Sequence, residues 1–148
     1  MEKIKAYGIC LYKYKQNSIE LLLCKSVKSF HRWGFLKGVA LLNEQPEETA
    51  IREFFEESGI LVDKKNLENY YFQKNELKNI GIYLVNYNSI FNADRYFLNG
   101  VLQTKHLSHE NSEVRFFDIN QLPIIKKKQS LLTKEIVKHF NGDIDEQF

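Results

Sequence analysis

Residues 38–60 read GVALLNEQPEETAIREFFEESGI, and this stretch contains the most clearly predicted helix of the chain. Pro46 suits the first helical position, because its φ is already helical and the N–H that it lacks would have no partner there. Glu47 and Glu48 follow in the first turn, where the helix dipole favours negative charge. Gly59 suits the left-handed conformation that ends many helices. The stretch therefore predicts a helix over residues 46–58.

One face of this helix is predicted to pack against a hydrophobic core. Four apolar residues recur at helical spacing and form a stripe: Ala50, Ile51, Phe54 and Phe55. Such a stripe is typical of a helix that covers a sheet or another helix. We therefore expect all four side chains to be structural rather than functional.

Three glutamates, Glu53, Glu56 and Glu57, share a different face of the helix. Like charges three or four residues apart repel by roughly 0.2–0.5 kcal/mol per pair. Glu56 and Glu57 also lie in the last turn, where the helix dipole disfavours anions. A bound cation would offset this repulsion, and carboxylate oxygens prefer hard divalent ions such as Mg²⁺ or Mn²⁺. The alternative is an acidic face exposed to water, and the three glutamates alone leave both interpretations open.

The composition favours a single globular domain over residues 1–148. Hydrophobic residues make up 43% of the chain, while 7 glycines and 2 prolines exclude a collagen-like or a Pro/Gly-rich disordered protein. The net charge of +2 by itself indicates neither nucleic acid nor membrane as a partner. No segment approaches the roughly 20 apolar residues of a membrane span, and the N-terminus lacks the apolar stretch of a signal peptide.

The two cysteines, Cys10 and Cys24, are too few for a disulfide framework or a metal knuckle. Both lie in apolar runs, which predicts two small core residues in a reducing compartment. We expect a soluble cytoplasmic protein, a monomer or a weak dimer, with no membrane partner.

Apolar and β-branched runs predict the strands of the fold. They cover residues 4–14, 19–24, 67–73, 80–86, 96–102 and 113–118. Residues 26–38 are expected to be irregular. A second helix is predicted over residues 130–140, with Ser130 as its N-cap and Gly142 just beyond its end. The order of these elements indicates an α/β fold in which helices cover a mixed sheet.

The polar residues of the opening stretch have the spacing G-x5-E-x7-R-E-U-x-E-E-x-G-U, where U is a bulky apolar residue and Phe54 occupies the first U. The fixed positions are Gly38, Glu44, Arg52, Glu53, Glu56, Glu57, Gly59 and Ile60. This pattern resembles the motif of the Nudix hydrolases over 23 residues, with every fixed position filled. The resemblance implies the Nudix fold, a three-layer α/β/α sandwich around a central mixed β-sheet. It also implies a metal-dependent enzyme that cleaves nucleoside diphosphates linked to another group.

The resemblance further implies roles for individual residues. The three glutamates of the helix and the main-chain carbonyl of Gly38 are expected to hold Mg²⁺, or Mn²⁺ in its place. Arg52 is expected to orient Glu53 through a charge-assisted hydrogen bond, and Glu44 to support the site. Bound metal ions would neutralise the charge that develops on the phosphate oxygens and acidify a bound water.

The residue that accepts the proton of the attacking water is left open. Glu53 is one candidate. Another is Glu110, because Nudix enzymes often supply an additional catalytic or metal-binding glutamate from a loop at this point of the chain. Glu113 is the second choice in the same loop, and the alternative for both is an ordinary exposed acid.

Residues 33–38, WGFLKG, resemble the W-x-x-P-K-G segment of the diadenosine polyphosphate, diphosphoinositol polyphosphate and mRNA-decapping branches, with Leu36 in place of proline. Lys37 would then contact a phosphate. The layout is most similar to asymmetric diadenosine tetraphosphate hydrolases. The expected substrate-binding residues are Lys37, His31, Arg32, Trp33, Lys78 and Tyr83.

Several of these residues have simpler alternatives. Packing in the core is the alternative for Trp33, and ordinary surface exposure is the alternative for His31 and Lys78. Tyr83 is one of several tyrosines and phenylalanines available to stack on adenine. The basic run at residues 126–128 is expected to be a solvated helix entry, with RNA phosphates as the alternative partner.

The leading hypothesis is a Mg²⁺-dependent hydrolase of dinucleoside polyphosphates. A second hypothesis is pyrophosphohydrolysis at the 5′ end of RNA, suggested by residues 33–38, although the near-neutral chain offers no extended basic track. A third is a non-catalytic nucleotide-sensing module, which the complete set of motif glutamates disfavours.

Overall fold

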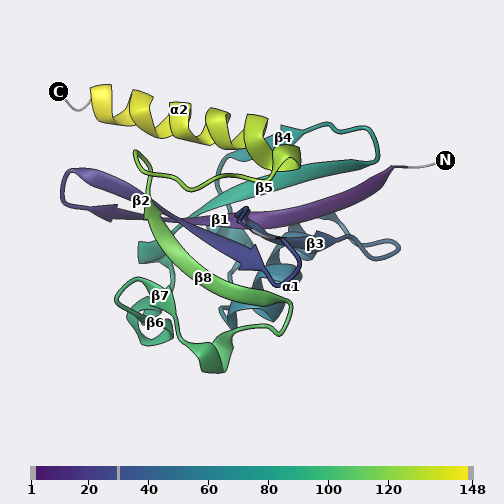
Figure 1. Ribbon diagram of the computed structural model, residues 1–148, viewed down its shortest axis with the longest axis horizontal. Coiled ribbons are helices and arrows are strands. Elements are labelled where there is room, and N and C mark those ends of the chain that lie inside the picture. Colours follow the sequence, from purple (N-terminus) through teal and green to yellow (C-terminus); the bar gives the residue numbers. More distant parts are fainter. Residues whose placement is uncertain (1–2, 30, 147–148) are drawn as a thin grey trace.

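The computed structural model describes residues 3–29 and 31–146 and places two helices on opposite sides of a mixed β-sheet (Figure 1). The helices are α1 (Pro46–Ser58) and α2 (Ser130–Glu146). The strands are β1 (Ile4–Lys15), β2 (Ser18–Ser26), β3 (Leu36–Val39), β4 (Tyr70–Gln73), β5 (Lys78–Asn86), β6 (Phe97–Leu98), β7 (Val101–Leu102) and β8 (Asn111–Asp118).

The strand order is β4-β5-β1-β2-β8-β7-β6, and β3 pairs with β1 outside this path. β1 and β5 run parallel, and the other pairs are antiparallel. This confirms the predicted mixed sheet and the three-layer α/β/α arrangement of the Nudix fold. Among the residues described, no helix is long and apolar enough to cross a membrane.

Strand β1 is buried on both faces and separates two hydrophobic clusters. Tyr7 and Ile9 belong to the cluster that contains residues of α1, while Ala6 and Cys10 belong to the cluster that contains residues of α2. This alternation follows from the two-residue period of a strand. Cys10 and Cys24 are both buried and unpaired, which confirms their predicted place in the core.

The predicted helix over residues 46–58 is confirmed, and Gly59 adopts the left-handed conformation with φ 77°. The backbone N–H of Gln45 donates to Glu48 Oε1 at 3.0 Å and closes the start of the helix, a contact that was not predicted. The predictions for β1, β2, β5 and β8 are confirmed to within about two residues at each end, the usual uncertainty of such boundaries.

The exposure of Phe55 contradicts its predicted place in the apolar stripe, because 49% of this residue is exposed. Ala50 and Phe54 are fully buried, and Glu57 is only 6% exposed. At about 100° per residue, Glu57 lies roughly 20° from Ala50 around the helix, whereas Phe55 lies roughly 140° from it. The buried face of α1 is therefore rotated toward the acidic face.

Four other predictions differ from the structure. Residues 96–102 form no continuous strand, because Asn99 (φ 53°) and Gly100 (φ 77°) turn the chain between β6 and β7. Gly142 lies inside α2, and Ser130 is the first residue of α2 rather than its N-cap. The predicted strand over residues 67–73 begins only at Tyr70.

The segment predicted to be irregular contains β3, which pairs with β1 over residues 6–9. Gly8 permits this pairing, since a Cβ at that position would lie 2.2 Å from the carbonyl oxygen of Leu36. The pairing places Lys37 opposite Gly8 and Gly38 opposite Tyr7. The start of the motif is thereby attached to the central strand.

Candidate active site

Helix α1 presents the three motif glutamates at very different depths. The side chain of Glu53 is 15% exposed and that of Glu56 is 53% exposed, while Glu57 is 6% exposed. Burial is the main cause that raises the pKa of Glu57, and repulsion from the nearby Glu53 adds to it. The structure thus places Glu53 and Glu57 close together as a largely buried pair and leaves the Glu56 side chain exposed at the surface.

Arg52 connects the motif residues to one another. Its Nε donates to Glu44 Oε2 at 2.8 Å, and its Nη2 donates to Glu44 Oε1 at 3.0 Å. Its Nη1 donates to Glu53 Oε1 at 2.8 Å and to Glu56 Oε1 at 3.2 Å. The contacts expected of Arg52 with Glu53, and of Glu44 with the site, are both present.

Glu44 is the acceptor at the base of this network. Besides Arg52, its Oε1 accepts from the backbone N–H of Leu41 at 3.0 Å and from Thr49 Oγ1 at 2.7 Å. The hydrogen bonds from Arg52 are the main cause that lowers the pKa of Glu44 to about 2. Glu44 is therefore ionised at neutral pH and fixes the orientation of Arg52.

Replacing Arg52 by lysine keeps the charge but removes the planar donor fork. We expect kcat to fall by about 10–100-fold, because Glu53 loses the group that orients it. The Arg52→Lys protein should also be less stable at pH 7. Because the pKa of Glu44 is depressed in the folded state, its contribution to stability is present above about pH 4.5 and is lost as the pH falls toward 2.

The stability difference between wild type and Arg52→Lys should accordingly shrink from pH 5 to pH 2 in urea unfolding. Arg115→Lys is the matched control, because Arg115 lies on an exposed part of β8 and contacts Glu113 at 3.6 Å and the ring of Phe117 rather than any motif residue. Wild-type kcat in Arg52→Lys would contradict the positioning role.

Glu57 is a buried carboxylate with one oxygen satisfied and one not. Asn111 Nδ2 donates to Glu57 Oε1 at 2.9 Å, whereas Oε2 has no hydrogen-bond partner among the described residues. Burial raises the pKa of Glu57 to about 7, with Asn111 opposing the rise and Glu53 adding to it. A buried, unpartnered carboxylate oxygen is costly unless a cation or a proton occupies the position next to it.

Asn111 is a site residue that the sequence did not reveal. Asn111 directly follows Glu110 in the sequence, is the first residue of β8 and is 5% exposed. A polar residue at an inward-facing strand position is a weak signal, and only the fold shows that its partner is Glu57, 54 residues away.

Glu110 lies close enough to the buried pair to interact with it. The pKa of Glu53 is raised, mainly by burial and also by repulsion from Glu56 and Glu110, and Glu110 likewise contributes to the raised pKa of Glu57. Glu110 therefore lies near the buried pair and is itself exposed to solvent.

The backbone of Gly38 lies directly against the carboxylate of Glu53. A Cβ built on Gly38 would be 1.9 Å from Glu53 Cδ and 2.1 Å from its Oε2. Only glycine leaves this space open, which explains its place at the start of the motif. The main chain of β3 and the carboxylates of α1 thus form two walls of one site.

The residues present fit a hard divalent ion. Glu53 and Glu57 supply carboxylate oxygens, one of which is buried without a partner, and Gly38 leaves room beside them. Among the described residues, no three metal-binding side chains are already arranged as a formed site. Arg52 Nη1 instead donates to both Glu53 and Glu56, so those carboxylates are shared with a protein cation.

Most of the expected substrate-binding cations gather beside this site. Lys37, Lys78 and Arg32 line a cavity of about 330 Å³. Burial, assisted by repulsion from Lys78 and Lys126, lowers the pKa of Lys37 to about 8. A phosphate group beside Lys37 would favour its charged form and replace the water that the ammonium group has lost.

The remaining candidates are placed differently. Trp33 is 8% exposed and packs edge-on against Phe117 with ring centroids 4.7 Å apart, as a core residue does. Tyr83 donates its hydroxyl proton to Glu47 Oε1 at 2.9 Å, so it ties β5 to the first turn of α1. His31 is exposed in the segment between β2 and β3.

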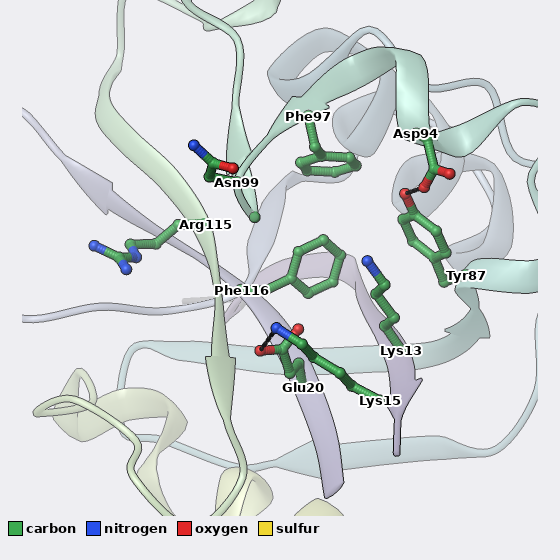
Figure 2. Close-up of a pocket in the computed structure, with 10 residues that line it drawn as sticks. Lys13, Lys15, Glu20, Tyr87, Asp94, Phe97, Asn99, Arg115 and Phe116 are labelled. Carbon is green, nitrogen blue, oxygen red and sulfur yellow. Dashed lines mark hydrogen bonds and ion pairs between the residues drawn. The ribbon is translucent and has the colours of Figure 1, made fainter.

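A separate cavity of about 590 Å³ lies away from the motif (Figure 2). Its two acids are engaged within it, since Glu20 pairs with Lys15 at 3.9 Å and Asp94 accepts from the hydroxyl of Tyr87. None of the expected site residues lines this cavity. Size alone therefore does not mark the functional site.

Comparison with solved structures supports the fold. The C. elegans Ap4A hydrolase in a binary complex aligns with a TM-score of 0.66 and 21% identity, over 94% of this chain and 98% of that one. A Nudix hydrolase from M. smegmatis, RenU, aligns with a TM-score of 0.66 and 14% identity, over 93% and 86%. A NUDIX hydrolase from Nitrosomonas europaea aligns with a TM-score of 0.64 and 17% identity, over 95% and 72%.

A search among curated proteins finds no match. The family model of the NUDIX domain matches residues 3–140, which include every element from β1 through β8 and most of α2. The chain therefore belongs to the NUDIX family and is a hydrolase that acts on pyrophosphate bonds.

Proposed function

We propose that the protein is a divalent-metal-dependent pyrophosphohydrolase that cleaves a P–O–P bond in a dinucleoside polyphosphate such as diadenosine tetraphosphate. The main support is the juxtaposition of a buried carboxylate pair with an unpartnered oxygen and a cavity lined by lysines. The first suits a divalent cation, and the second suits a chain of phosphates. The likeness to an Ap4A hydrolase over nearly the whole length of both chains agrees with this substrate class.

Glu53, Glu56 and Glu57 would hold Mg²⁺ or Mn²⁺ with the main-chain carbonyl of Gly38, and Glu110 would join them from the β8 side. When bound, such an ion neutralises charge on the phosphate oxygens and lowers the pKa of water. Arg52 fixes the Glu53 carboxylate, and Asn111 fixes that of Glu57. Lys37 would contact the phosphate chain next to the reacting phosphorus.

In the proposed reaction, a water oxygen forms a bond to phosphorus while the bond from that phosphorus to the bridging oxygen breaks. The bridging oxygen and its electron pair leave with the departing phosphate. A carboxylate accepts the proton of the water. Glu53 suits this role by its raised pKa and its fixed orientation, and Glu110 suits it by its exposed position near Glu53 and Glu57.

The experiment is the hydrolysis of diadenosine tetraphosphate with and without Mg²⁺, in heavy-oxygen water, beside a 5′-triphosphorylated oligonucleotide. We expect metal-dependent turnover of the dinucleotide, with the heavy oxygen in one product showing which phosphorus is attacked. Faster processing of the oligonucleotide would favour the RNA 5′-end function instead. Tight nucleotide binding without turnover in either Mg²⁺ or Mn²⁺ would favour a sensing module.

We also propose a cytoplasmic location. Both cysteines are buried and unpaired, which suits a reducing compartment.

Metal binding should depend on pH through Glu57. Protons compete with a metal ion for a carboxylate, and the pKa of Glu57 is about 7 in the metal-free protein. The apparent Kd for Mg²⁺ should therefore be about tenfold weaker at pH 6 than at pH 8. Mg²⁺ should accordingly raise Tm more at pH 8 than at pH 6, as measured by differential scanning fluorimetry. An equal rise in Tm at pH 6 and at pH 8 would contradict the protonation of Glu57 at pH 6.

A further inference from the structure

The cavity beside the acidic site is lined by an unusual number of cations. Besides Lys37, Lys78 and Arg32, the basic run Lys126–Lys128 lines it, and no carboxylate does. These residues come from the segment before β3, from β3, from the start of β5 and from the entry to α2. The fold thus gathers positive charge that is dispersed along the sequence.

No ion pair within the described parts of the chain offsets this charge. None of the ion pairs formed between described residues includes any of the six cations. The pKa of Lys78 is lowered by burial and by repulsion from Lys128 and Lys126. Six cations around one small cavity repel one another, which indicates an anionic ligand of high charge density.

The backbone of the basic run is held in place from two sides. The carbonyl oxygens of Lys127 and Lys128 accept from Gln73 Nε2 at 3.2 Å and from Asn75 Nδ2 at 3.0 Å, respectively. On the other side, the N–H of Lys126 donates to the carbonyl oxygen of Trp33 at 2.9 Å. The backbone of the run is therefore held in place at the entry to α2, where Lys127 and Lys128 are exposed, as predicted for a solvated helix entry.

Gln129 completes the attachment just after the run. Its Oε1 accepts from the backbone N–H of Phe35 at 2.8 Å. A Cβ on Gly34 would lie 2.6 Å from Gln129 Nε2, so the two segments are in close contact. The chain that leads into β3 and the chain that leads into α2 thus form one packed unit.

The cavity also lies near the acidic site, since Glu57 is close enough to Lys37 to oppose the fall in the pKa of that lysine. Lys37 lines the cavity, and the next residue, Gly38, lies against the carboxylate of Glu53. A ligand that reaches from the acidic site into the basic cavity needs a phosphate in the acidic site and further negative charge in the cavity. A short linear polyphosphate has this chemistry.

We propose that Lys126, Lys127 and Lys128 bind the part of the substrate's phosphate chain that extends beyond the scissile bond, so that they select substrates by the number of phosphates. This inference rests on the proposed function, since it deepens the description of the same site. The compact cavity favours a short polyphosphate over a nucleic-acid backbone. The cations Lys13, Lys15 and Arg115 line the separate cavity of Figure 2, which shares no lining residue with this one.

The first test measures binding without catalysis. Inorganic tripolyphosphate and pyrophosphate are titrated into the metal-free protein by calorimetry. We expect wild type to bind tripolyphosphate more tightly. A triple variant, Lys126→Gln, Lys127→Gln and Lys128→Gln, should bind tripolyphosphate about tenfold more weakly or worse, because charge-assisted contacts are lost, with a smaller loss for pyrophosphate.

The matched control removes the same total charge at three exposed lysines that line neither cavity, by the changes Lys64→Gln, Lys65→Gln and Lys138→Gln. It should bind tripolyphosphate within about twofold of wild type, because screening weakens distant charges. The single variant Lys128→Gln gives an intermediate Kd and guards against a folding defect in the triple variant. Equal losses in the control and in the basic-run triple variant would overturn the proposal.

The second test uses dinucleoside polyphosphates of two to five phosphates with Mg²⁺. The basic-run triple variant should raise KM for the longer members and change kcat little, which separates a binding role from a catalytic one. If wild type hydrolyses none of these compounds but tripolyphosphate binding still depends on the basic run, the proposed substrate falls and the phosphate site stands. If a 5′-hydroxyl RNA strand binds as tightly as tripolyphosphate through the same lysines, the cavity serves a nucleic-acid backbone and the proposal is overturned.

Discussion

Glu57→Gln is expected to stabilise the metal-free protein at pH 8 and to remove nearly all hydrolysis. The folded-state pKa of Glu57 is raised to about 7. Its favourable contribution is therefore present below about pH 4.5 and is lost as the pH rises through 7. Above pH 7 the folded protein bears the full penalty of a buried charge with an unpartnered oxygen.

Glutamine removes this charge and still accepts the hydrogen bond from Asn111. The expected gain in free energy of unfolding is on the order of 1–3 kcal/mol at pH 8, and it should vanish near pH 5. The expected loss in kcat is roughly 10³-fold, because metal binding contributes several kcal/mol to transition-state stabilisation.

Urea unfolding at pH 5 and pH 8 in the presence of a chelator measures the first effect, and turnover in Mg²⁺ measures the second. Glu56→Gln is the matched control for the stability measurement, since this glutamate lies on the same helix but its side chain is 53% exposed. Its stability should stay within about 0.5 kcal/mol of wild type, as is usual for surface positions. A Glu57→Gln protein that is less stable at pH 8, or that retains turnover, would contradict the assignment.

Gly38→Ala should disable the enzyme while leaving most of the fold intact. The new Cβ would lie 1.9 Å from Glu53 Cδ, so the Glu53 carboxylate must move away from β3. A displacement of about 1 Å at a catalytic group costs on the order of 10²-fold in rate. Overpacking should also lower the free energy of unfolding by about 1–3 kcal/mol.

A double-mutant cycle separates these effects. Glu53→Asp shortens the obstructing side chain, so adding it to Gly38→Ala should restore part of the lost stability but none of the activity. Gly142→Ala is the control, because a Cβ there meets nothing within 4 Å; it should stabilise α2 by about 0.5–1 kcal/mol. Wild-type kcat in Gly38→Ala would show that Glu53 does not need its position against β3.

The elements that could be predicted are those with strong local signals. Pro46, the acidic first turn and Gly59 define α1 without help from the rest of the chain. Where tertiary packing competes with local pattern, prediction failed. The hydrophobic stripe predicted Phe55 inside, yet the helix buries Glu57 and leaves Phe55 exposed. The Asn99-Gly100 pair did offer a local signal for a hairpin, since both residues tolerate positive φ, and the apolar run around them concealed it.

The sequence by itself predicted that the acidic motif lies on one helix and that a mixed sheet surrounds this helix. These features could be predicted because periodicity and capping act over a few neighbouring residues. Only the tertiary structure decided that Asn111 satisfies Glu57, that Gly38 leaves space for Glu53, and that the basic run stands beside Lys37. These contacts join residues far apart in the chain, and the sheet brings them together. No local pattern encodes such distances, since they depend on how the strands pair.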